Sequence, residues 1–484
     1  MRKASFDGLE SGVRLVPLCV DLDGTLVKSD TLIDSLLVLL RTRPALLLGL
    51  PGALLRGKAA FKGFVTDSIT LDVEHLPYNR GVLQFLDQER GQGRPIWLAT
   101  GADVRLAERV AEHLGIFAGV LGSDGATNLT GDRKLESLRR SLGDGPFDYI
   151  GNDTPDLPLL RQAQTVLVAN PSLGLRMGLR KLGIKPAEEF KESRHVAGAL
   201  LKAARVHQWA KNLLMLLPLL LAHGVTLAHL LTAVLAFFCF SLTASATYMV
   251  NDLLDIEADR RHPHKRRRPF ASGDLSAALG LGVVGALLAV GLGVGRLLPP
   301  AFFLWLLLYL VSTLAYSLYL KRVPLVDVLV LSGLYTLRLQ AGAAATATPI
   351  SHWLAGFSIF LFLSLAIVKR FAELENLRSS GKQPTNGRGY LVADIEQIRS
   401  FGTASAYAAV VIFAIYISGP QVTALYRHAR LLWLIVPFML LWLNRVWLLA
   451  SRGELNEDPV VFALTDRMSL VIGVAVAAIA LLAL

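Results

Sequence analysis

The sequence predicts two domains of different kinds: an N-terminal α/β domain with a parallel sheet, and a C-terminal all-α polytopic membrane domain. Short apolar runs alternate with helix-like stretches up to about residue 190, whereas long apolar stretches recur from about residue 200. The 484 residues are 53% hydrophobic and only 18% charged, which excludes a disordered chain and an ordinary soluble enzyme throughout.

The N-terminal domain, residues 1–190, is expected to contain four strands. They are Leu15–Val20, Pro95–Ala99, Phe147–Ile150 and Thr165–Ala169, each followed by a helix-like stretch. The start of the chain is charged, and its first apolar run is too short for a signal peptide.

A pair of carboxylates follows the first of these strands. Asp21 and Asp23 stand two residues apart in the run DLDGT, and Gly24 permits a tight turn after them. Carboxylate oxygens at a strand end suit Mg²⁺. One carboxylate can attack phosphorus while the other acts as acid and base. The motif therefore predicts phosphoryl chemistry.

Residues 14–185 resemble the haloacid dehalogenase-like (HAD) phosphatases in this motif and in three later ones. The resemblance implies that Thr100 binds phosphate, that Lys134 clamps it, and that the run from Gly151 to Asp156 helps to hold Mg²⁺. The ligands implied in that run are Asn152, Asp153 and Asp156, but the family usually has aspartate at the position of Asn152. The domain is thus expected to be an active phosphatase or a degenerate binding module.

The resemblance also implies a helical cap between the first two strands. The interval Leu36–Phe64 is apolar and carries several basic residues, among them Arg41, Lys58 and Lys62. It is expected to form either an ordinary buried cap or one that touches the membrane surface and admits a lipid-bound substrate.

The membrane domain, residues 205–484, follows a linker at 191–204. Nine spans are expected, with eight and seven as alternatives: Leu213–Val225, Leu227–Val250, Leu275–Val294, Pro300–Leu320, Val323–Ala345, Trp353–Val368, Phe401–Ser418, Leu431–Leu449 and Leu470–Leu484. The first and the last are shorter than the roughly 20 residues that cross a bilayer.

The basic residues predict the orientation of these spans. The loops after every second span carry most of the lysines and arginines, whereas the opposite loops carry only Arg296, Arg427 and Arg430. The positive-inside rule places the basic loops and the N-terminal domain in the cytoplasm, at the inner (plasma) membrane. The net charge of +11 then reflects orientation and anionic substrates, with no nucleic acid as partner.

A second acidic motif ends the second span. Asp252, Asp255 and Asp259 follow Asn251, at spacings that bring them close to one helical face. Clustered carboxylates repel one another unless a cation lies between them, and a diphosphate held through Mg²⁺ is the natural ligand. Lys265 and Arg268 follow and can contact phosphates, although a solvated helix end is the plainer alternative.

Residues 200–484 resemble the UbiA prenyltransferase superfamily in this motif and in the RPFASG run that begins at Arg268. The resemblance implies helices around a chamber that opens to the cytoplasm. In place of a second aspartate-rich motif, the chain has the run from Tyr316 to Asp327, which includes Lys321.

Other stretches are similar to one branch of that superfamily, the decaprenyl-phosphate phosphoribosyltransferases. They are QWAKN around Lys211, LRLQAG around Arg338, and VKRFAEL with Lys369 and Arg370. These cations, together with Tyr316, Lys321 and Asp327, are expected to bind substrate. The alternatives are helix-end anchors for the lysines and Arg370, and an interhelical hydrogen bond for Arg338.

The resemblance implies a transferase that moves 5-phosphoribose from phosphoribosyl pyrophosphate (PRPP) to a polyprenyl phosphate with Mg²⁺. The fused phosphatase is expected to remove the 5-phosphate of the lipid-linked product. Two alternatives remain: a prenyltransferase with a prenyl diphosphate donor and an aromatic or other acceptor, and a transporter or scaffold without activity. The sequence does not indicate an oligomeric state.

Overall fold

The computed structural model describes residues 15–191, 195–223, 225–380, 389–455 and 459–484, so the charged start of the chain lies outside the described residues. The chain forms two compact units. The first contains Met1–Ala204 and Asp252–Gly282, and the second contains Arg205–Asn251 and Val283–Leu484. By its contacts, the acidic motif at Asp252 therefore belongs to the same unit as the α/β domain.

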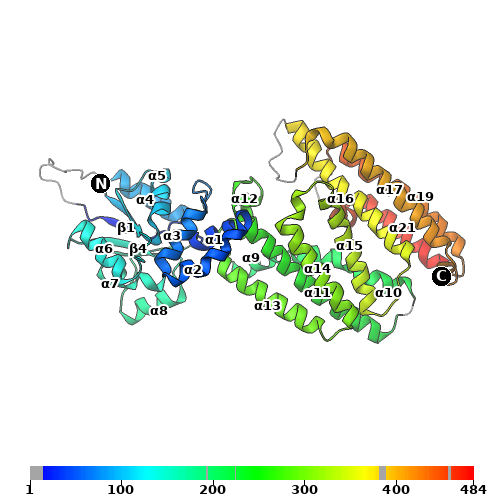
Figure 1. Cartoon of the computed structure of the whole chain (residues 1–484), viewed down its shortest axis with the longest axis horizontal. Helices are drawn as coiled ribbons and strands as arrows, with labels where there is room; N and C mark the ends of the chain where they lie inside the picture. The colour runs from blue at the N-terminus through cyan, green and yellow to red at the C-terminus, as the bar shows by residue number, and fades with distance from the viewer. Residues whose placement is uncertain (1–14, 192–194, 224, 381–388, 456–458) are drawn as a thin grey trace. The chain divides into compact units, whose positions relative to one another are not determined.

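A six-stranded parallel sheet forms the centre of the first unit (Figure 1), in the order β3-β2-β1-β4-β5-β6. The strands are β1 (Leu18–Val20), β2 (Ile96–Asp103), β3 (Gly119–Ser123), β4 (Asp148–Gly151), β5 (Val166–Ala169) and β6 (Glu188–Phe190). The four predicted strands are confirmed. The two that the sequence does not reveal, β3 and β6, form the edges of the sheet, where a strand needs less apolar character.

Helices cover both faces of the sheet. Leu18 and Val20 of β1 join a buried cluster with α4 and α5, whereas Cys19 between them joins a cluster with α6, α7 and α8. This alternation is the period-2 pattern of a strand buried on both sides. The helices are α4 (Arg80–Gly91), α5 (Val104–Leu114), α6 (Asp132–Leu142), α7 (Leu157–Gln162) and α8 (Leu173–Lys181).

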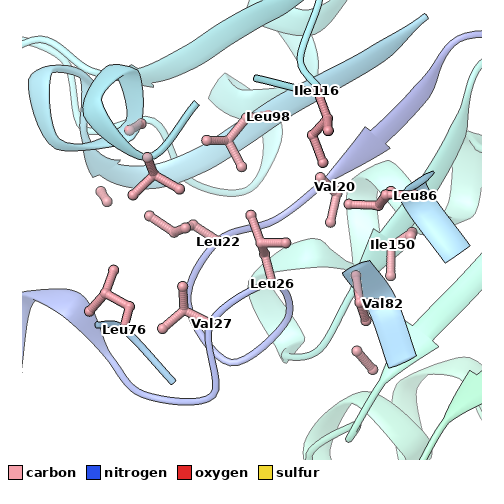
Figure 2. Packing of buried hydrophobic residues seen from close by; sticks show 14 of the residues in the cluster. Val20, Leu22, Leu26, Val27, Leu76, Val82, Leu86, Leu98, Ile116 and Ile150 are labelled. Carbon is pink, nitrogen blue, oxygen red and sulfur yellow. The ribbon is translucent and has the colours of Figure 1, made fainter. Parts of the chain in front are cut away.

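The loop after β1 is fixed by its own apolar side chains. Leu22, Leu26 and Val27 are fully buried in the cluster of Val20, and Figure 2 shows them pointing into that core. Gly24 has a φ of +74°, and a Cβ at that position would lie 1.9 Å from Nδ2 of Asn152. Glycine is therefore required both for the left-handed turn and for the close approach of Asn152.

The expected cap interval is helical. It contains α1 (Thr31–Thr42), the 3₁₀ segment η1 (Pro44–Gly49), α2 (Leu50–Leu55) and α3 (Lys58–Ser68). Asp30 caps α1 by accepting hydrogen bonds from the backbone N–H groups of Leu32 and Ile33. Leu48 and Leu55 remain 87% and 90% exposed, so the described chain does not bury this part of the cap.

The membrane domain is helical. Among the described residues, seven helices are long and apolar enough to cross a bilayer, and they coincide with seven of the nine expected spans. They are α11 (Leu227–Leu254), α13 (Ala277–Gly295), α14 (Pro300–Leu318), α15 (Val326–Ala345), α16 (His352–Ser380), α17 (Ile395–Ser418) with the preceding η6 (Val392–Asp394), and α19 (Ile435–Ser451) with the preceding η7 (Ala429–Leu434). The first and last expected spans are shorter: η3 (Val206–Leu216) with α10 (Leu217–Leu221), and α21 (Arg467–Ala483).

Shorter segments connect these helices. Helix α9 (Val196–Ala203) lies within the stretch expected as a linker, and α12 (Ile256–Arg261) and η4 (Lys265–Arg267) follow α11. The others are η5 (Leu320–Arg322), η6 (Val392–Asp394), α18 (Pro420–Thr423), η7 (Ala429–Leu434) and α20 (Pro459–Thr465). Among the described residues of the second unit, apolar clusters form around Phe240 and Tyr309, around Phe371 and Trp447, and around Ile417.

Candidate active sites

The first candidate site is a cavity of about 570 Å³ in the α/β domain, at the carboxyl end of β1. We call it the Asp21 pocket. The residues of interest that line it are Asp21, Asp23, Gly24, Lys62, Gly101, Ala102, Lys134, Asn152, Asp153, Asp156, Asn170 and Ser172. Loops at the carboxyl ends of parallel strands are the usual ligand site of such a sheet. The expected residues of three motifs thus meet in one cavity.

Lys134 is the most strongly paired group of this pocket. Its ammonium lies 2.8 Å from Oδ1 of Asp21 and 3.0 Å from Oδ1 of Asp156, and it donates a hydrogen bond to the hydroxyl of Tyr149. The side chain is buried, so these partners offset its desolvation. Together they raise its pKa above the usual range of lysine, which keeps it charged.

The two carboxyl groups of the DLDGT run differ in their surroundings. Burial raises the pKa of Asp21 to about 6, although the charge of Lys134 opposes the shift. Burial and the nearby charge of Asp30 raise the pKa of Asp23 further, to about 8. The backbone N–H of Thr31 at the start of α1 donates to Oδ1 of Asp23 at 2.8 Å. Asp21 therefore ionises more readily, and Asp23 retains a proton at neutral pH.

The later acidic motif divides into two roles. Both carboxylate oxygens of Asp156 accept hydrogen bonds, one from Lys134 and Tyr149 and the other from the backbone of Asn152 and Asp153. Asp156 thus holds Lys134 and the loop in place. The side chain of Asn152 lies against Gly24 of the DLDGT turn.

The structure does not bring the hydroxyl of Thr100 to the cavity wall. Thr100 is fully buried, and its Oγ1 accepts a hydrogen bond from the backbone N–H of Ala102. The cavity is lined at this point by Gly101 and Ala102. Thr100 therefore shapes the turn that presents these two residues.

Lys62 of the cap is a site residue that the motif comparison does not identify. Its ammonium donates to the carbonyl of Gly101 and lies 2.8 Å from Oδ1 of Asn128, and burial lowers its pKa. It also lines a neighbouring hollow of about 840 Å³, together with Leu54, Lys58, Phe61 and Arg133. The signal in the sequence is weak, because Lys62 is one of several basic residues in the cap interval.

The acidic motif of the membrane domain does not lie on one continuous helix. Helix α11 ends at Leu254 and α12 begins at Ile256, with Asp255 between them. The expectation of a single helical face is therefore wrong at Asp255. One nitrogen of Arg268 lies 3.0 Å from Asp252 and 2.7 Å from Asp259, whereas Asp255 forms an ion pair with Arg41 at 3.0 Å.

Burial affects the protonation of one carboxyl group in this motif. Asp252 and Asp259 are buried, and burial raises the pKa of Asp259 to about 6 while Arg268 opposes the shift. Lys265 is half-buried and contributes to the same field. The two carboxylates that share Arg268 thus face one another across a cation, which is the arrangement that clustered carboxylates need.

The second unit contains another cavity, of about 310 Å³, which we call the basic cavity. Five cations line it: Arg205, Lys211, Arg338, Lys369 and Arg370. Tyr248, Tyr309, Tyr316 and Tyr335 add hydroxyl groups, and Gln208, Asn251 and Thr313 add further polar atoms. No aspartate or glutamate of the described chain lines it. Such a concentration of positive charge among apolar helices indicates an anion site.

Arg338 is held by a network within this cavity. It donates to Oδ1 of Asn212 at 2.9 Å and to the carbonyl of Leu334, and it lies over the rings of Tyr309 and Tyr335. The interhelical hydrogen bond considered as its alternative role is present. However, Arg338 also lines the cavity, so the two roles coexist.

The expected second motif is only partly at the cavity wall. Tyr316 lines it, whereas Asp327 is fully buried behind it, where it pairs with Arg370 at 2.6 Å and accepts a hydrogen bond from Tyr390. Lys321 contacts Oδ1 of Asn251 at 3.1 Å. The geometry therefore gives Asp327 the task of positioning Arg370, which corrects its expected contact with substrate.

Four residues of this cavity carry no recognisable signal in the sequence: Tyr248, Tyr309, Tyr335 and Arg205. The tyrosines stand within apolar spans, where a hydroxyl needs a partner. Arg205 has a left-handed backbone with a φ of +49°, which no motif marks.

Two family models match this chain. Residues 212–482 match the UbiA prenyltransferase family, and residues 18–161 match the haloacid dehalogenase-like hydrolases. The uncharacterised protein y4nM of Sinorhizobium fredii is 38% identical over 466 residues, which cover 96% of this chain and 90% of that protein. The nodulation protein NoeC of Azorhizobium caulinodans is 34% identical over 273 residues, or 56% of this chain and 88% of that one.

A third relative matches the membrane domain alone. Decaprenyl-phosphate phosphoribosyltransferase of Mycobacterium tuberculosis is 40% identical over 191 residues, which cover 38% of this chain and 63% of that protein. The match thus spans less than two thirds of that relative. The family model covers more than half of this chain, and the described helices have the length and composition of membrane spans. The chain is a multi-pass membrane protein of the UbiA prenyltransferase family, with a haloacid dehalogenase-like domain at its N-terminus.

Proposed function

We propose that this protein transfers 5-phosphoribose from PRPP to a polyprenyl phosphate, and that its α/β domain then removes the 5-phosphate from the lipid-linked product. The basic cavity carries the proposal. Five cations without a carboxylate among the described lining residues suit two anionic reactants, and PRPP and a lipid phosphate are both anionic. The similarity to decaprenyl-phosphate phosphoribosyltransferase supports the same donor.

Both sites contain oxygen atoms that suit Mg²⁺ as ligands. Asp252, Asp255 and Asp259 offer carboxylate oxygens for it, and in the α/β domain the carboxylate of Asp21 and the amide oxygen of Asn152 do so. The side chain of Asp23, whose pKa is raised to about 8, is assigned to proton transfer. When bound, the ion neutralises charge on a diphosphate or phosphoryl group. Asp153 is a weaker candidate, because its Oδ1 already accepts hydrogen bonds from Thr154 and Ser172.

In the proposed transfer, the side chains of the membrane domain bind and orient the reactants. Lys211, Lys369 and Arg338 neutralise phosphate groups, and Tyr316 and Tyr335 exclude water from the same cavity. The bond from C1 of the ribose to pyrophosphate breaks, and an oxygen of the lipid phosphate forms the new bond. This step needs no side-chain nucleophile.

In the proposed hydrolysis, Asp21 attacks the phosphorus of the 5-phosphate and Asp23 protonates the departing ribose oxygen. The pKa values of the two groups support this division, because Asp23 holds a proton more tightly than Asp21. Water then releases phosphate from Asp21. The neighbouring hollow combines Lys58 and Arg133 with Leu54 and Phe61, which suits a substrate with both phosphate and apolar parts.

The proposed reactions require the α/β domain and the acidic motif to lie on the cytoplasmic side of the inner membrane. The basic loops between the spans support this orientation. The exposed Leu48 and Leu55 of the cap suit contact with a lipid surface.

The second candidate is transfer from a prenyl diphosphate to an aromatic or other acceptor, with a regulatory α/β domain. Membership in the UbiA prenyltransferase family favours it. The same acidic motif and the tyrosines of the basic cavity would serve a prenyl diphosphate.

The test is turnover by the purified full chain in detergent, with Mg²⁺, polyprenyl phosphate and PRPP labelled in the ribose. We expect labelled lipid from the wild type and none from Asp252→Ala. We expect Asp21→Asn to leave the 5-phosphate on that lipid. Turnover of a prenyl diphosphate without labelled lipid from PRPP would overturn the proposal in favour of the second candidate.

A further inference from the structure

One buried ion pair ties the cap of the α/β domain to the acidic motif of the membrane domain. Nη1 of Arg260 lies 2.8 Å from Oδ2 of Asp34 in α1, and Nη2 donates to the hydroxyl of Ser29 at 3.1 Å. Asp34 is fully buried and Arg260 is 5% exposed. Arg260 directly follows Asp259 in the sequence. The fixed position of α1 therefore determines where the end of the motif lies.

A second contact on the same helix reaches the motif itself. Arg41 stands in the last turn of α1, two turns beyond Asp34. Its Nη1 lies 3.0 Å from Oδ1 of Asp255 and 3.2 Å from the carbonyl oxygen of Leu254, the last residue of α11. Arg41 thus caps the end of α11 and neutralises the carboxylate at the break before α12.

The other end of α1 belongs to the Asp21 pocket. The backbone N–H of Thr31, the first residue of the helix, donates to Oδ1 of Asp23. A helix of 12 residues is about 18 Å long. One short, rigid element therefore holds a carboxyl group of the Asp21 pocket at its first residue and a carboxylate of the acidic motif in its last turn.

We propose that the α/β domain supplies part of the transferase's diphosphate site, with Arg41 as the residue that makes Asp255 selective for a cation–diphosphate complex over the bare cation. The inference rests on the proposed function of the acidic motif, but it holds for either donor, because PRPP and prenyl diphosphates both release pyrophosphate. Asp34 and Arg260 are positioning residues that keep α1 against the motif.

The sign of the effect follows from charge. A guanidinium beside Asp255 repels a divalent cation that approaches the same carboxylate. Once the cation carries a pyrophosphate, the net charge of the complex is negative, and the same guanidinium attracts it. Loss of Arg41 should therefore strengthen binding of the bare cation and weaken binding of the complex.

The experiment measures Mn²⁺ binding to the full chain in detergent by electron paramagnetic resonance, without and with pyrophosphate. All variants carry Asp21→Asn to disable the cation site of the Asp21 pocket. Arg41→Gln is compared with Arg41→Lys, which keeps the charge, and with Arg56→Gln, a matched loss of an exposed cap arginine. We expect Arg41→Gln to bind Mn²⁺ about fivefold more tightly and to lose about fivefold of the gain that pyrophosphate gives.

The controls separate selectivity from mere packing. Arg41→Lys and Arg56→Gln should keep the wild-type ratio of Mn²⁺ affinities with and without pyrophosphate. An Arg41→Gln variant that matches Arg56→Gln in both measurements would overturn the proposal. So would one that weakens both affinities equally, since that result indicates only a loosened helix. Neither outcome depends on PRPP as donor, so the failure of the proposed function is detected separately in the turnover assay.

Discussion

The Asp21 pocket and the basic cavity differ in how they balance charge. In the Asp21 pocket the central cation, Lys134, is paired with two carboxylates at 2.8 and 3.0 Å. In the basic cavity five cations share a wall in which the described residues include no carboxylate. A site whose cation is already neutralised can present a nucleophilic carboxylate. Asp327 and Glu373 lie outside that wall and pair with one of the five cations, Arg370. A wall that carries several cations favours anionic substrates.

The comparison predicts that each site fails separately. Asp21→Asn removes the proposed nucleophile but keeps the shape of the side chain. We expect phosphate release from the lipid-linked product to fall about a thousandfold or more, with the transfer step unchanged. Single-turnover assays of the two steps on one preparation measure both effects. An equal loss in both steps would contradict the independence of the sites.

The transfer reaction should depend strongly on each single cation of the basic cavity. Lys369→Gln removes one positive charge from its wall, and we expect kcat/KM for transfer to fall roughly ten- to hundredfold. Arg296→Gln is the matched control, because Arg296 is exposed at the end of α13. Hydrolysis of a small phosphate ester by the Asp21 pocket should stay the same in both variants. A transfer rate unaffected by Lys369→Gln would assign this lysine to anchoring the span.

The sequence predicts which carboxylates come together in these sites better than it predicts which cations do. DLDGT and the motif from Asn251 to Asp259 are contiguous, so their spacing alone brings oxygens together. The basic cavity draws Arg338 and Lys369 from separate helices and Arg205 from the turn between α9 and η3, and only the packing of these elements shows that the three residues meet. Asp327 illustrates the limit, since its motif predicts contact with substrate although its oxygens are taken by Arg370 and Tyr390.

The fold, like the sites, is only partly predictable from the sequence. The central strands β1, β2, β4 and β5 are apolar and predictable, whereas the edge strand β6 begins with two glutamates and carries little signal. Likewise, the sequence predicts one helix that continues through Asp259. The structure shows that α11 ends at Leu254, where Arg41 from a distant part of the chain caps it. A break that depends on a contact with α1 cannot be derived from local spacing.

A substitution of Asn152 should change the Mg²⁺ requirement of the Asp21 pocket alone. Asn152→Asp adds a negative charge beside Gly24. We expect the Mg²⁺ concentration for half-maximal phosphate release to fall about tenfold, because a charged ligand binds the ion more tightly than an amide. The Mg²⁺ dependence of transfer should not move. A rise in the requirement of the phosphatase would show that Asn152 is not near its cation.

The smallest expected effect is that of pH on phosphate release. We expect kcat/KM for this step to vary by no more than about tenfold between pH 6 and 8. Asp21 must be ionised to attack, and its pKa is raised to about 6, so activity should fall as the pH drops below that value. Asp23 must be protonated to act as an acid, and its pKa is raised to about 8, so activity should also fall as the pH rises above it. Bound Mg²⁺ stabilises the ionised forms and should move both limbs to lower pH. A pH series of kcat/KM at several Mg²⁺ concentrations measures this shift. Activity that stays constant up to pH 10 would remove Asp23 from the role of acid.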